Sequence, residues 1–311
     1  MDKRDEPILS RPVAVFLLAT ISCALWGSAF AMVKTGYGLF QISEDDPAGQ
    51  LLFAGMRFTL AGIFVLLGTA VVRRRAPLPT RDDLAPIVML GLSQTALQYA
   101  PFYLGLAHAS GTNSSLVQGT SVFVQVILAT LVFRQERLTG RKLVGCLLGM
   151  GGVLLVNLRG GGALGSWSLM GEGLILASVV SEGCAVCLMR RYSLKGDPLL
   201  LTGWQFIFGG LALVAVGLAM GGAIGAHAPA AMAVLAYLGM LSAVAFSIWS
   251  LLLKNNPVSH VAMYHALIPV FGVVFSVLLL GEVIPVSQLP LLVVALALIA
   301  AGTVVVNGEA A

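Results

Sequence analysis

Charged residues are scarce in this chain of 311 residues, since Asp, Glu, Lys and Arg together make up 10% of it. A soluble globular protein carries roughly a quarter of its residues as charges, so the composition excludes an ordinary soluble protein. Apolar residues reach 58%, and the 36 glycines show no collagen or linker pattern. Glycines in that setting suit helices that pack closely in lipid. We therefore expect an integral membrane protein whose partners include the lipid bilayer and no nucleic acid.

Cysteines and catalytic motifs are also sparse. The four cysteines lie inside apolar runs, where we interpret them as small buried side chains, and Cys184-x-x-Cys187 lacks the second pair that a metal site would need. The sequence holds no Gly-Lys-Ser/Thr phosphate loop, no His-Glu-x-x-His and no Gly-x-Ser-x-Gly elbow. ATP hydrolysis by this chain is thereby excluded and an intramembrane hydrolase is disfavoured. We predict no catalytic residue, no cofactor and no metal.

Long apolar runs recur through the whole chain, each about as long as the hydrocarbon core of a bilayer is thick. The first run continues past Trp26 to Lys34, which is too long for a cleaved signal peptide. The runs predict an all-α membrane protein with ten transmembrane helices. We place them at residues 12–34, 51–72, 84–106, 114–133, 142–158, 169–190, 199–220, 229–252, 259–280 and 288–306.

Basic residues follow the alternation of the loops between these spans. If the N-terminus is cytoplasmic, all of the 18 Lys and Arg residues except Lys34, Arg57 and Arg159 lie in cytoplasmic segments. Cytoplasmic loops of membrane proteins are enriched in Lys and Arg. The distribution therefore predicts a multi-pass protein with both termini in the cytoplasm.

An internal repeat relates the two halves of the chain. An apolar run that ends at Glu136, followed by a run that closes at Asn157, returns as a run ending at Glu282 and another closing at Asn307. Five spans per half is an odd number, so the second half enters the membrane from the opposite side. We predict two inverted five-helix domains, residues 12–158 and 169–307. Inverted repeats are the construction of transporters that open one site alternately to either face.

Several short motifs carry a resemblance to a known family. They are Trp26-Gly27, Lys34, Arg57-Phe58, the Glu136 and Glu282 positions, and the spacing from Gly152 to Asn157 and from Gly302 to Asn307. With them the chain resembles the drug/metabolite transporter superfamily, in the branch with two EamA domains, and within it the bacterial YddG-type exporters of aromatic and other amino acids. The resemblance implies a basket of ten helices in the bacterial inner membrane. It also implies a central cavity between spans three, four, eight and nine, and export from the cytoplasm.

Polar residues inside the spans suggest where that cavity lies. Ser114, Gln118, Ser121 and Gln125 recur at helical spacing on one face of span four. Such a face avoids lipid, so it meets either a cavity or another helix. The second half offers aromatic residues instead, and a zwitterionic amino acid could place its polar end on the amides and its side chain on the rings. We predict a substrate cavity lined by Gln94, Gln98, Tyr99, Ser114, Gln118, Ser121, Gln125, Ser242, Trp249, His260 and Tyr264.

Ionisable residues at membrane depth are candidates for a role in binding or coupling because their burial is costly. Arg57 could meet a substrate carboxylate, or it could be a structural tie to a glutamate or to carbonyl oxygens. Glu182 could attract a cation, carry a proton or pair with a neighbour such as Ser178. His265 could couple protons or make a structural contact.

The sequence favours a secondary transporter that exports amino acids. The alternatives are an exporter of cationic drugs or other small metabolites and, in another class, a membrane-embedded enzyme. We expect a monomer or a homodimer formed through spans five and ten. The preferred amino acid and any proton coupling stay open at this point.

Overall fold

The structure is a computed structural model that describes residues 8–159, 168–224, 229–284 and 286–307, and within these ranges every regular element is a helix. Six helices run without interruption. They are α1 (Pro12–Leu39), α2 (Pro47–Arg73), α7 (Gly140–Arg159), α9 (Pro198–Ala219), α10 (Pro229–Asn255) and α13 (Leu289–Asn307).

The other long segments change helix type along their length. They are α3 (Arg81–Leu90) with η2 (Gly91–Ala96) and α4 (Leu97–His108), then α5 (Gly111–Gln118) with α6 (Ser121–Ile127) and η3 (Leu128–Val132), then η4 (Leu169–Gly173) with α8 (Leu174–Ser193), and lastly α11 (Val258–Ala262) with η5 (Met263–Ala266) and α12 (Leu267–Leu280). Two short 3₁₀ turns, η1 (Ile8–Ser10) and η6 (Val286–Gln288), complete the set.

Two of the interruptions lie against each other. Pro269, which has no N–H to donate, lies in the first turn of α12, directly after the 3₁₀ turn η5. A Cβ placed on Gly119, in the break between α5 and α6, would lie 3.1 Å from the Pro269 side chain. The two broken segments therefore meet where each of them is irregular.

Seven helical segments of the described residues are long and apolar enough to cross a membrane, and Leu289–Gly302 is a shorter apolar helix. The seven are Pro12–Leu39, Pro47–Arg73, Gly111–Val132, Leu169–Ser193, Pro198–Ala219, Pro229–Asn255 and Val258–Leu280. All the helical segments begin and end within five residues of the ranges predicted from the apolar runs. The all-helical membrane-type architecture is as predicted, whereas ten crossings remain a prediction.

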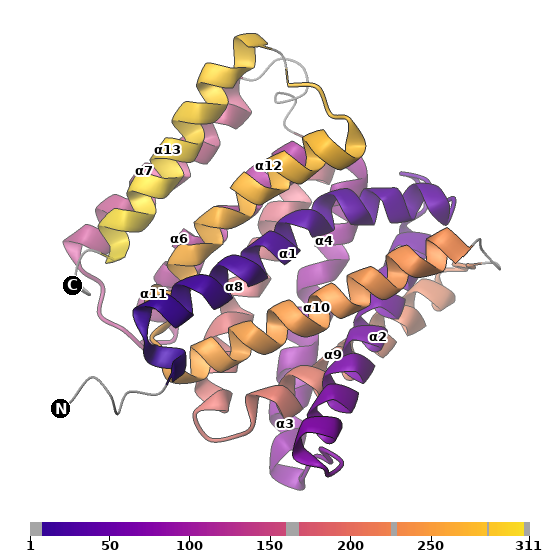
Figure 1. Ribbon diagram of the computed structural model, residues 1–311. Coiled ribbons are helices and arrows are strands. Elements are labelled where there is room, and N and C mark those ends of the chain that lie inside the picture. Colours follow the sequence, from indigo (N-terminus) through magenta and orange to yellow (C-terminus); the bar gives the residue numbers. More distant parts are fainter. Residues whose placement is uncertain (1–7, 160–167, 225–228, 285, 308–311) are drawn as a thin grey trace.

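The helices pack in a recurring set of pairs (Figure 1). α2 lies against α9, α7 lies against α13, α1 lies between α10 and α12, and α8 lies beside α4 and α6. The α7–α13 pair forms one edge of the molecule (Figure 1). A homodimer through these two helices stays a prediction.

Glycines allow α2 and α9 to approach closely. A Cβ on Gly62 would lie 2.7 Å from the backbone oxygen of Gly203, and one on Gly210 would lie 2.6 Å from the backbone nitrogen of Thr59. Small residues at such crossings let helix backbones approach in lipid. The contact therefore requires glycine on both helices.

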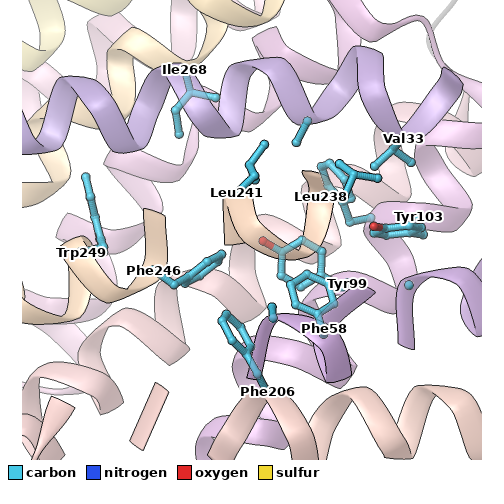
Figure 2. Packing of buried hydrophobic residues seen from close by; sticks show 14 of the residues in the cluster. Val33, Phe58, Tyr99, Tyr103, Phe206, Leu238, Leu241, Phe246, Trp249 and Ile268 are labelled. Atoms are coloured by element: carbon cyan, nitrogen blue, oxygen red, sulfur yellow. The ribbon is translucent and has the colours of Figure 1, made fainter. Parts of the chain in front are cut away.

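Aromatic side chains join the halves of the chain at the centre of the bundle (Figure 2). The ring centroids of Phe58 and Tyr99 lie 4.1 Å apart, those of Phe58 and Phe206 lie 5.3 Å apart, and those of Phe206 and Phe246 lie 5.0 Å apart. All four side chains are buried, and they come from α2, α4, α9 and α10. Two of these residues, Tyr99 and Phe246, also line the cavity described below.

Candidate functional site

A cavity lies among the helices of both halves of the chain. Its volume is about 40 Å³. One water needs roughly 10–15 Å³ of such a volume, so in this conformation the cavity has room for a few waters. Its lining residues are Trp26, Ala29, Phe30, Arg57, Gln98, Tyr99, Phe102, Gln118, Glu182, Phe246 and Ile268.

Arg57 on α2 is the cationic group of this cavity. Its Nε donates to the backbone oxygen of Leu238 at 3.3 Å and to Ser242 Oγ at 3.0 Å, and its Nη1 donates to Tyr103 Oη at 2.8 Å. The side chain is only 1% exposed. Within the described part of the chain it has no carboxylate in ion-pair range, and its Nη2 makes no hydrogen bond. The guanidinium is thus fixed in place while its charge stays uncompensated.

Glu182 on α8 contributes a carboxyl group to the cavity lining. Its carboxylate accepts a hydrogen bond from Gln118 Nε2 and a second one from Gln125 Nε2 at 3.3 Å. The side chain of His265 also approaches it, with Nδ1 3.5 Å from Glu182 Oε1. The partners that fix the carboxylate by hydrogen bonds are therefore neutral amides.

The protonation of His265 follows from Gln125. The Gln125 Nε2, which can only donate, lies 2.9 Å from His265 Nδ1 as well as facing Glu182. With the amide in this orientation Nδ1 accepts, and the approach of the neutral ring to Glu182 is then not an ion pair. Stacking of the His265 ring on Trp249, with centroids 4.2 Å apart and planes at 18°, holds it there.

Several polar atoms around the cavity are buried without a hydrogen-bond partner. Among the cavity-lining residues they are Trp26 Nε1, Gln98 Oε1 and Gln118 Oε1. Buried polar atoms of proteins are nearly always paired, so each such atom calls for an explanation. One donor and two acceptors beside the cavity suit a polar ligand.

The residues predicted from the sequence fall into three groups. Those that line the cavity are Arg57, Gln98, Tyr99, Gln118 and Glu182. Those that contact a lining residue from behind are Gln125, Ser242, Trp249 and His265, and Ser121 contacts His265 in turn. Those that lie away from the cavity lining are Gln94, Ser114, His260 and Tyr264. Contact of any of these residues with a substrate stays a prediction.

The polar stripe of span four is divided by a break in its helix. α5 ends at Gln118 and α6 begins at Ser121, so the four residues do not share one continuous helical face. Ser114 donates to the backbone oxygen of Ser110, whereas Ser121 and Gln125 turn to His265. Gln118 is the residue of the stripe that reaches the cavity.

Apolar residues supply much of the lining that sequence reasoning missed. Ala29, Phe30, Phe102 and Ile268 carry no pattern that separates them from other buried residues of a membrane helix. Trp26 belongs to one of the motifs that carry the family resemblance, and that motif does not indicate that its ring lines the cavity. Its ring makes edge contacts with Phe246, Trp249 and His265.

Two glutamates fix the ends of the broken segments. Glu282, after α12, accepts from the backbone nitrogens of Gly111 and Thr112 at 2.8 and 3.1 Å and from Thr112 Oγ1 at 2.6 Å. Glu136, after η3, accepts from the backbone nitrogen of Ser259 at 3.0 Å and from Lys142 Nζ at 2.9 Å. Burial raises the pKa of Glu136, but the hydrogen bonds from Ser259 and Lys142 outweigh burial and leave that pKa below its ordinary value.

A family pattern described as the EamA-like transporter family matches this chain twice, at residues 13–158 and 169–308. An uncharacterized transporter of Archaeoglobus fulgidus is 29% identical over 86% of this chain and 89% of its own length. A probable terminal-alkyne amino-acid exporter of Streptantibioticus cattleyicolor is 26% identical over 96% of this chain and 94% of its own length. A solved crystal structure with 20% identity superposes with a TM-score of 0.70 over 96% of this chain and 98% of that one, which shows a shared fold.

Proposed function

Since this chain belongs to the EamA-like transporter family, we propose that it is a secondary transporter that exports amino acids from the cytoplasm by alternating access. The observation that carries the proposal is the buried cavity between the two halves, which combines aromatic rings with hydrogen-bond donors and acceptors. Ligand sites of proteins have this composition, an apolar lining with a few placed polar groups. The full-length similarity to a protein named as an amino-acid exporter supports the same substrate class.

The proposal includes ten membrane crossings in two inverted halves, residues 12–158 and 169–307. If the halves are equivalent, α2 corresponds to α9 and α7 to α13, and each of these helices packs on its counterpart. The position of α1 beside α10 and α12 corresponds likewise to that of α8 beside α4 and α6. This exchange of partners is what a two-fold relation between the halves would produce.

We place the protein in the bacterial inner membrane with both termini cytoplasmic. The distribution of Lys and Arg among the loops supports this orientation. α1 begins and α13 ends at the same end of the bundle (Figure 1), as an even number of crossings requires. Reporter fusions at the two ends that lie on opposite faces would contradict the orientation.

Export of cationic compounds is the second candidate, and the observation in its favour is Glu182 in the cavity lining. Arg57 lines the same cavity without a carboxylate partner among the described residues. A purely cationic ligand would leave that buried charge uncompensated, which is costly at membrane depth. An amino acid therefore fits the pair of charges better than a cation does.

Counterflow in proteoliposomes tests the proposal. Purified protein is reconstituted with an unlabelled amino acid inside, and uptake of the same labelled compound is followed without any imposed gradient. We expect transient accumulation of labelled amino acids and none in protein-free liposomes. If a labelled quaternary amine accumulates while no amino acid in a panel does, the second candidate is correct and the amino-acid proposal is wrong.

A further inference from the structure

We infer that the cavity recognises both ends of a zwitterion separately, with Arg57 binding the α-carboxylate and Glu182 binding the α-ammonium of one amino acid. The inference rests on the proposed function and deepens it, because it assigns the two charges of the site and defines the substrate class by them. It starts from one buried guanidinium and one buried carboxyl group that line the same cavity and form no ion pair with each other.

Arg57 has the properties of a carboxylate receptor. Hydrogen bonds to Ser242, Tyr103 and the Leu238 carbonyl use Nε and Nη1 and fix the plane of the guanidinium, while Nη2 stays unbonded among the described residues. The cation also lies 4.9 Å from the ring centroid of Phe58, which supports it from α2 itself. A planar, immobilised guanidinium is the preferred protein partner of a carboxylate.

Trp26 supplies a further hydrogen-bond donor beside the cavity. Its Nε1 is buried and has no hydrogen-bond partner, although the indole ring lines the cavity. A buried Trp N–H usually finds an acceptor. A polar atom of a bound ligand would provide one.

Glu182 has the complementary properties of an ammonium receptor. The donors that fix its carboxylate, Gln118 and Gln125, are neutral, and His265 is neutral when it accepts from Gln125. The carboxyl group is therefore held in position without a cationic hydrogen-bond partner among the described residues. An ammonium brings three donors, and Gln98 Oε1 and Gln118 Oε1 are two further acceptors that are buried and unpaired beside the cavity.

The rings of the lining suit the remaining part of the substrate. Phe30, Phe102 and Phe246 contribute apolar surface between the helices of the two halves. Aromatic or large aliphatic side chains would bury the most area against them. Because the present cavity admits only a few waters, such a side chain must displace the rings, and binding is thereby linked to a movement of the helices that carry them.

The inference is tested with three ligands that share one side chain. Competition against labelled phenylalanine in proteoliposomes compares phenylalanine with phenethylamine, which lacks the carboxylate, and with 3-phenylpropionate, which lacks the ammonium. A single-charge compound leaves either Arg57 or Glu182 buried without its partner. We expect each to compete at least about 100-fold more weakly than phenylalanine.

Two substitutions should change this profile in opposite directions. Glu182→Gln removes the reason to require an ammonium, so 3-phenylpropionate should gain at least about 10-fold relative to phenylalanine, whereas phenethylamine should not. Arg57→Gln should do the reverse. Arg57→Lys keeps the charge and should retain the preference for the zwitterion, which gives a second variant if Arg57→Gln does not fold.

Glu172→Gln is the matched control, since Glu172 is 2% exposed, accepts from Asn113 Nδ2 and lies outside the cavity lining. Its ligand profile should equal that of the wild type. If wild-type protein accepts all three compounds equally, or if both cavity variants weaken them in parallel, the assignment of the two charges is wrong while amino-acid export still holds. Absence of counterflow with every amino acid would instead refute the proposed function itself.

Discussion

Glu136 and Glu282 stand in a reciprocal relationship, because each follows one broken helical segment and accepts a backbone N–H at the start of the other. Glu282 reaches Gly111 and Thr112 at the start of α5, and Glu136 reaches Ser259 in the first turn of α11. A carboxylate at a helix N-terminus pairs with N–H groups that have no intrahelical acceptor. The two segments are thus tied together at both ends, and a movement that separates the two segments at one end would break the hydrogen bonds of one of these glutamates.

The tie at Glu136 should depend on pH. Its hydrogen bonds lower the pKa of the carboxyl in the folded protein, so the stabilisation is present above the pKa of the unfolded chain and is lost as pH falls through the lower, folded value. Glu136→Gln should therefore reduce the melting temperature at pH 7. The difference from wild type should shrink as the pH is lowered from about 4.3, the usual value of a glutamate, towards more acid conditions.

Thermal unfolding of detergent-purified protein over a pH series measures this effect. Lys142→Met is an informative companion, because it removes one of the two partners and keeps the Ser259 N–H. It should show a smaller, same-signed difference at neutral pH. A Glu136→Gln difference that does not change between neutral and acid pH would contradict the role assigned to the carboxylate.

The tie at Glu282 should show coupling to Thr112. Glu282→Gln replaces a charged acceptor of three hydrogen bonds by a neutral one and should destabilise the protein by roughly 1–2 kcal/mol, the usual cost of a lost helix cap. Thr112→Val removes the hydroxyl donor alone. In a double-mutant cycle the loss of stability in the double mutant should be smaller than the sum of the two single losses, because both substitutions affect the same hydrogen bond. Strict additivity would show that the 2.6 Å contact contributes nothing.

The close crossing of α2 and α9 should not tolerate a single methyl group. In Gly62→Ala the new Cβ would lie 2.7 Å from the backbone oxygen of Gly203, which cannot move aside as a side chain could. We expect a loss of roughly 1–3 kcal/mol, as for other overpacked sites. Gly68→Ala on the same helix meets nothing within 4 Å and should be neutral or slightly stabilising. Melting temperatures that fall equally for both would contradict this account of the crossing.

Substitution of two buried glutamines should affect export differently, because one lines the cavity and the other does not. Gln118→Leu removes a donor to Glu182 and an unpaired acceptor beside the cavity, so export should fall at least about 10-fold. Gln94→Leu is the matched control, since Gln94 is buried, makes no hydrogen bond among the described residues and lies outside the cavity lining. It should leave export unchanged. Initial rates from proteoliposomes, normalised to reconstituted protein, measure both, and equal loss in the two variants would refute the distinction.

The sequence predicts those structural features that depend on the residues of one segment alone. Lengths of apolar runs predict the helix ranges closely, because a helix in lipid must pair its backbone groups along its own length. The motifs around Trp26 and Arg57 predicted the family, and the family assignment is confirmed. Gln98 and Gln118 could be proposed as cavity residues, and Glu182 as a binding or coupling residue, because polar groups at membrane depth are few.

What the sequence could not provide depends on contacts between distant segments. The spacing of Ser114, Gln118, Ser121 and Gln125 assumes one continuous helix, and the break at Gly119 changes which of them reach the cavity. Phe30 and Phe102 have no polar signature. The hydrogen bonds that Glu136 and Glu282 each accept from the other segment depend on how the two segments lie against each other.

The α7–α13 pair at the edge of the molecule contributes none of the residues identified in the cavity lining, although its two helices come from the two halves of the chain. Fluorophores attached to these two helices would therefore lie away from the residues that line the cavity. A change in the distance between such labels during counterflow would report, on single molecules, how far the two halves turn against each other in each transport cycle.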